Sequence, residues 1–110
     1  MKILKKYNLE VNNNRISSKD NDKQILTHFL SFWENTQDIK EDLLPELNLV
    51  ITKKLKFNDI GADVVGVAYV EKEITKLIGS DIGHSNFELP TEDFKKIILE
   101  WLSILEKVRS

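Results

Sequence analysis

The chain has no cysteine, two prolines and four glycines among its 110 residues. Without cysteine, neither disulfides nor thiolate metal ligands are available. Four scattered glycines do not form a phosphate-binding loop, which needs clustered glycines before a helix. Residues 1–11 lack the continuous apolar stretch of a signal peptide or membrane span. We therefore expect a cytoplasmic protein without a membrane anchor.

The composition is that of a globular protein, with 41% hydrophobic and 31% charged residues. A chain of this length is within the usual range for one domain and can bury a core without covalent cross-links. We expect residues 1–110 to form a single domain.

The net charge of −2 hides an uneven distribution. Residues 57–94 contain eight acidic residues and two lysines, a net charge of −6, and residues 34–46 have a net charge of −4. This pattern argues against nucleic acid as a ligand, which would require a basic stripe. It is compatible with a basic partner protein, or with an acidic surface that only promotes solubility.

Two segments have the apolar spacing of amphipathic helices. The clearer is 91–108, where apolar side chains recur at steps of three and four, Thr91 can cap the start, and acids and bases suit the helix dipole. The second is 21–36, where Ile25, Phe29 and Trp33 share one face. Trp33 and Trp101 are both expected in the core.

Five segments are predicted to be strands, because they alternate apolar and polar residues or are rich in β-branched and aromatic ones. They are residues 1–11, 47–57, 64–70, 71–79 and 85–89. For 71–79 a helical turn ending at Gly79 is the alternative, and a strand is favoured. The turn sequence of residues 58–61 predicts that the second and third of these strands form a hairpin.

The connections complete the predicted fold. Three asparagines at 12–14 suit a turn, and residues 79–84 suit a loop. Residues 36–46 are an acidic connector in which Pro45 disfavours helical backbone at Leu44. The expected class is α+β: a small, mostly antiparallel sheet of about four or five strands, with helices at 21–36 and 91–108 packed on it.

No group of residues has the pattern of a catalytic or metal site. Asp81, His84 and Ser85 only superficially resemble a triad, because triads normally gather from distant segments. His28 lies among apolar neighbours in a predicted helix, and no histidine pair completes a metal site. We expect no enzyme activity, no cofactor and no metal.

The segment NFELPTEDF at residues 86–94, which leads into Trp101 and Leu102, resembles the C-terminal end of small bacterial immunity proteins. These proteins are cognate inhibitors encoded beside polymorphic or contact-dependent growth inhibition toxins. The resemblance implies a single-domain cytoplasmic protein that blocks a toxin, often a nuclease. It supplies no binding residue.

A nuclease binds its polyanionic substrate with a basic surface, so an acidic inhibitor would be attracted to that surface. We therefore expect a monomer whose toxin-binding face is formed by carboxylates of the 57–81 region: Asp59, Asp63, Glu71, Glu73 and Asp81. The alternative function is a small acidic chaperone of a secreted effector, which would require an exposed apolar groove or self-association.

Overall fold

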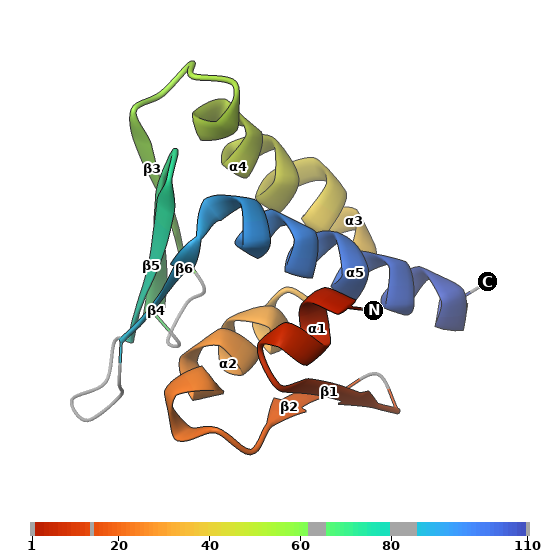
Figure 1. The fold of residues 1–110 in the computed structure, drawn as a ribbon. Coiled ribbons are helices and arrows are strands. Elements are labelled where there is room, and N and C mark those ends of the chain that lie inside the picture. Colours follow the sequence, from red (N-terminus) through yellow and green to blue (C-terminus); the bar gives the residue numbers. More distant parts are fainter. Residues whose placement is uncertain (1, 14, 62–65, 80–85, 110) are drawn as a thin grey trace.

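The computed structural model describes residues 2–13, 15–61, 66–79 and 86–109. Its main layer is an antiparallel sheet in which neighbouring strands are also consecutive in the sequence. These strands are β3 (Phe57–Gly61), β4 (Gly66–Glu71), β5 (Ile74–Gly79) and β6 (Phe87–Pro90). All helices lie on one side of this sheet (Figure 1). The α+β class predicted from the sequence is confirmed.

Alternation of side chains along the strands directs one set of residues toward the helices. Ala68 and Val70 of β4, Leu77 of β5 and Leu89 of β6 are all buried on this inner face. The strand predicted at 71–79 is confirmed over Ile74–Gly79 as β5, while Glu71 ends β4 and residues 72–73 form the turn between them. The strand predicted at 85–89 corresponds to β6.

The C-terminal helix predicted at 91–108 is confirmed as α5 (Thr91–Arg109). Its apolar stripe is buried and includes Phe94, Ile97, Ile98 and Trp101. The Thr91 hydroxyl donates to the Glu71 carbonyl and lies 2.8 Å from the Thr75 hydroxyl. Because the single Thr91 hydroxyl proton is used on the carbonyl, Thr75 is the donor in the second bond. The start of α5 is thus fixed to the sheet.

The helix predicted at 21–36 is confirmed in part. It consists of a 3₁₀ turn (Asn21–Lys23) followed by α2 (Gln24–Phe32). Phe29 of α2 packs on Phe94, with ring centroids 5.7 Å apart. After the helix ends, the Trp33 carbonyl accepts a 2.8 Å hydrogen bond from the Trp101 indole. None of the helices in the described ranges is long and apolar enough to cross a membrane.

The acidic connector predicted at 36–46 and the strand predicted at 47–57 are wrong. The structure has a continuous helical path through α3 (Thr36–Asp38), a π-helical turn (Ile39–Leu43) and α4 (Leu44–Ile51). Its buried residues follow a helical period: Ile39, Leu43, Leu47 and Val50. Burial of this apolar face outweighs the preference of Leu44, the residue before Pro45, for non-helical backbone. The Leu44 N–H bonds to the Ile39 carbonyl in the π-helical register, so the missing N–H of Pro45 falls at the junction of the π-helical turn and α4.

The strand predicted at 1–11 is also wrong over its first half. Residues Lys2–Lys6 form α1, followed by β1 (Leu9–Asn12), which pairs with β2 (Arg15–Ser18) in a second, two-stranded sheet. Asn8 has a φ of 54°, which separates the helix from the strand. Leu4 and Tyr7, three residues apart, are the buried pair. The turn predicted at 12–14 is confirmed at Asn13, which has a φ of 52°.

The turn predicted at 58–61 is wrong as well, because these residues belong to β3. The Asn58 amide donates to the carbonyl and the carboxylate of Glu46, at 3.1 and 2.6 Å. This contact with α4 and pairing with β4 outweigh the turn preference of asparagine and glycine. The predicted hairpin exists, but its first strand begins at Phe57. The loop predicted at 79–84 lies almost entirely outside the described residues.

Candidate functional site

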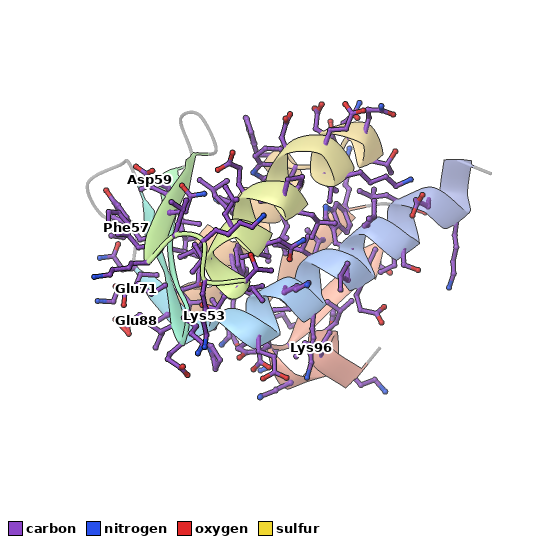
Figure 2. All side chains as sticks on the ribbon, turned by 90° about the horizontal axis from the view of Figure 1, so that it is seen from above. Lys53, Phe57, Asp59, Glu71, Glu88 and Lys96 are labelled. Carbon is purple, nitrogen blue, oxygen red and sulfur yellow. The ribbon has the colours of Figure 1, made fainter. Side chains whose placement is uncertain are left out.

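The face of the four-stranded sheet that points away from the helices carries aromatic and charged side chains. Phe57 is 61% exposed and Tyr69 is 38% exposed, and Asp59 and Glu71 are exposed beside them. In Figure 2 the side chains of Phe57, Asp59, Glu71 and Glu88 all project from this face. Large aromatic side chains are normally buried, so their exposure on a sheet face that none of the described helices covers marks a candidate interaction surface.

The strand register places four of these residues in a square, which we call the outer patch. Phe57 is directly opposite Glu71, and Asp59 is directly opposite Tyr69. Opposite side chains in an antiparallel pair have Cβ atoms about 4.5–5.5 Å apart, and diagonal ones lie about 7–8 Å apart. The two aromatic rings therefore occupy one diagonal of the outer patch and the two carboxylates the other.

The rest of this face is apolar with a mixed charged border. Half-buried Val67, Ile74 and Ile78 continue the apolar surface across β4 and β5. Lys76 of β5 is opposite both Tyr69 and Glu88. The strands thus contribute three carboxylates and one ammonium group to the outer face, which makes it moderately acidic.

The sequence-predicted binding residues are only partly brought together. Asp59 and Glu71 share the outer patch, and Glu73 is exposed in the turn between β4 and β5. Asp63 and Asp81 lie outside the described residues. Phe57 was not predicted as a binding residue, because the alternation pattern placed it at the end of a strand over 47–57. Tyr69 was not predicted either. The alternation of side chains along β4 is the signal that could have identified it, because Ala68 and Val70 on either side of Tyr69 face inward.

A second acidic region, the acidic segment, lies on the helical side of the molecule. It comprises residues 34–46, and its carboxylates are all exposed: Glu34, Asp38, Glu41, Asp42 and Glu46. Lys40 within it forms a 2.6 Å ion pair with Glu106 of α5. Because α4 packs on the inner face of the sheet, the acidic segment and the outer patch are separate surfaces (Figure 1).

One polar cluster, buried except for the Lys6 side chain, joins the α1 region to α5. The Asp93 carboxylate accepts hydrogen bonds from the Lys6 ammonium at 2.8 Å and the Tyr7 hydroxyl at 2.5 Å. These two bonds hold the pKa of Asp93 below its ordinary value, while burial and the neighbouring carboxylate raise the pKa of Tyr7. Both ring and carboxylate are buried, so we assign the cluster to the attachment of α1.

The described residues give no grouping of the kind needed for metal chemistry. Within the described ranges, no three histidine, aspartate or glutamate side chains are placed to share a metal ion. His28 is exposed on α2. His84 and Ser85 lie outside the described residues.

The chain matches no known protein-family model, and no similar curated protein or solved structure was found. The resemblance of residues 86–94 to immunity proteins therefore remains an expectation.

Proposed function

We propose that the protein is a non-catalytic cytoplasmic immunity protein that binds and neutralises a cognate toxin through the outer patch. The observation that carries the proposal is the pairing of exposed Phe57 and Tyr69 with Asp59 and Glu71 on the sheet face opposite the described helices. The partner is a protein with a basic surface, such as the nucleic-acid-binding surface of a nuclease. The protein acts as a monomer and has no nucleic acid ligand.

The composition of the outer patch supports a protein partner. Aromatic side chains supply most of the binding energy in many interfaces, because they bury a large area while losing few rotamers. Phe57 retains 61% of its surface in the free protein, so this area is available for burial. The half-buried Val67, Ile74 and Ile78 would extend the contact across the sheet.

The charges of the outer face support a basic partner. Asp59, Glu71 and Glu88 outnumber Lys76 on the strands of this face. Carboxylates around an apolar centre accelerate association with a positively charged surface and discriminate against acidic ones. An inhibitor that covers a nuclease surface in this way prevents substrate access and needs no chemistry of its own.

The test uses the polypeptide encoded directly beside this chain in its genome. Its C-terminal domain is expressed with and without the protein, and growth and the dissociation constant are measured. We expect protection from growth inhibition and specific binding. The double variant Asp59→Lys with Glu71→Lys should weaken binding by about tenfold or more, mainly through slower association, and should reduce the salt dependence.

A matched control separates the outer patch from general acidity. Glu41→Lys with Asp42→Lys makes the same charge change in the acidic segment, and we expect less than about a threefold loss of affinity. Equal losses for the two double variants would contradict the site assignment. A neighbouring polypeptide that is harmless to cells and does not bind would contradict the function.

Light scattering during size-exclusion chromatography tests the oligomeric state. The proposal requires a monomer in the absence of the toxin. A stable dimer that dissociates when Phe57 is replaced by Ser would show that the outer patch binds a second copy. That result would contradict the immunity function and favour the effector chaperone.

A further inference from the structure

The outer patch has a geometry that suits one particular kind of side chain. Its carboxylates, Asp59 and Glu71, are at opposite corners, and the rings of Phe57 and Tyr69 are at the other two. We propose that the outer patch receives an arginine side chain of the partner protein. This inference rests on the proposed function, because it identifies the chemistry by which that site recognises its partner.

The two carboxylates provide the charged part of such a site. They lie on a diagonal of about 7–8 Å between backbone positions, and their side chains can converge on one cation from two sides. A guanidinium group has five N–H donors arranged in a plane, so it can bond two carboxylates at once. An ammonium group is smaller, more strongly hydrated and less suited to bridging this span.

The two rings provide the other part. A guanidinium plane stacks on an aromatic face, and arginine is found in such contacts more often than lysine. Phe57 and Tyr69 each stand next to both carboxylates in the register, so a cation bound between Asp59 and Glu71 has an aromatic residue as its neighbour on each strand. Both residues are partly exposed, so part of each aromatic side chain is accessible to a partner.

The strands that form the outer patch supply carboxylates but no cation of their own. The strand residues of β3 and β4 include no lysine or arginine. The nearest cation in the register is Lys76, which lies across Tyr69 on the β5 side and is also opposite Glu88. Lys76 is opposite Glu88 and diagonal to Glu71, so two carboxylates share one ammonium group, and Asp59 has no cation beside it among the strand residues.

The first test uses blocked amino acids, so that no toxin is needed. N-acetyl-arginine amide and N-acetyl-lysine amide are titrated separately into the isotope-labelled protein, at matched ionic strength, and amide chemical shifts are followed. We expect arginine-induced shifts concentrated at residues 57–59 and 69–71, with an affinity about threefold or more above that of the lysine compound.

Two variants test the two parts of the site. Phe57→Ala should lower the affinity for blocked arginine by about twofold or more, and Asp59→Asn with Glu71→Gln should reduce it further, to the level of the lysine compound. The control Glu41→Gln with Asp42→Asn should leave it unchanged. All variants change exposed residues, and their amide spectra report whether the fold is retained.

The outcomes separate this inference from the proposed function. Equal shifts for arginine and lysine, or shifts mainly in the acidic segment, would overturn the arginine site even if a toxin binds. Selective arginine binding at the outer patch together with a harmless neighbouring polypeptide would support the site and contradict the toxin. With a toxin in hand, replacing its contacting arginine by lysine should weaken the complex about tenfold or more, and Phe57→Ala should largely remove that difference.

Discussion

Replacing Tyr7 with Phe tests the buried cluster that attaches α1 to α5. The Tyr7 hydroxyl donates to Asp93 at 2.5 Å, and Lys6 donates to the same oxygen at 2.8 Å. The substitution removes one hydroxyl and keeps the ring, including its edge contact with Phe87 at a centroid distance of 6.1 Å. The loss can therefore be assigned to one hydrogen bond.

The expected destabilisation follows from the charge and burial of the acceptor. A hydrogen bond to a charged group contributes about 1.5–3 kcal/mol to stability. Because Lys6 still neutralises Asp93 in the variant, we expect the lower part of this range, about 1.5–2 kcal/mol. For a domain of this size, such a change lowers the melting temperature by about 6–9 °C.

Acidification should reduce the effect of Tyr7→Phe. The Lys6 and Tyr7 hydrogen bonds hold the folded-state pKa of Asp93 below its ordinary value of 3.8. A carboxylate with a lowered folded-state pKa contributes its stability fully above the unfolded pKa, and this contribution is lost as the pH falls through the folded-state pKa. The difference between the two proteins should therefore be largest above about pH 5 and smaller near pH 2.5.

Urea and thermal unfolding at both pH values provide the measurements, and Tyr69→Phe is the control. Tyr69 is on the exposed sheet face, so loss of its hydroxyl should change stability by less than about 0.5 kcal/mol. The reasoning is refuted if Tyr7→Phe and Tyr69→Phe are equally stable, or if the loss of stability caused by Tyr7→Phe grows on acidification.

Two further pairs of substitutions, each a test and its control, probe the packing of the sheet and the core. Gly66→Ala should lower the free energy of unfolding by about 2 kcal/mol or more, because φ is 151° and a Cβ atom would lie 2.2 Å from the Ile78 carbonyl oxygen. A Cβ atom added at Gly61 would meet no atom within 4 Å, so Gly61→Ala should be nearly neutral in the same urea titration. Trp101→Phe should cost about 2–3 kcal/mol, since it removes the bond to the Trp33 carbonyl. Trp33→Phe should cost less, because its own buried indole N–H has no partner among the described residues, and an equal cost would contradict this.

The sequence predicts the C-terminal helix well because every local signal in it agrees. The apolar stripe from Phe94 to Leu105 is continuous, and both ends carry charges that suit the helix dipole. The strand prediction for residues 47–57 fails because their apolar residues fit both the two-residue period of a strand and the period of a helix. Leu47, Leu49 and Ile51 alternate as in a strand, whereas burial of Leu47 and Val50 follows a helix. Only packing against the sheet decides between the two.

The sequence predicts that the region of the candidate site is acidic, but it does not predict which of its residues share one surface. Asp59 and Glu71 stand out in the sequence because their region is acidic. Their proximity depends on the β3–β4 register, which pairs Asp59 with Tyr69 and Phe57 with Glu71. Assigning Phe57 to the end of a longer alternating strand hid its exposure, since the true strand begins at this residue. A partner surface that depends on the exact strand register leaves little local signal.

Cross-saturation NMR on the complex with the toxin domain is the most direct test of the outer patch as the binding surface. With the unlabelled toxin irradiated, we expect the strongest saturation at Phe57, Asp59, Tyr69 and Glu71, and little in residues 34–46. Saturation concentrated in residues 34–46 or along α5, with the strands unaffected, would contradict the central claim.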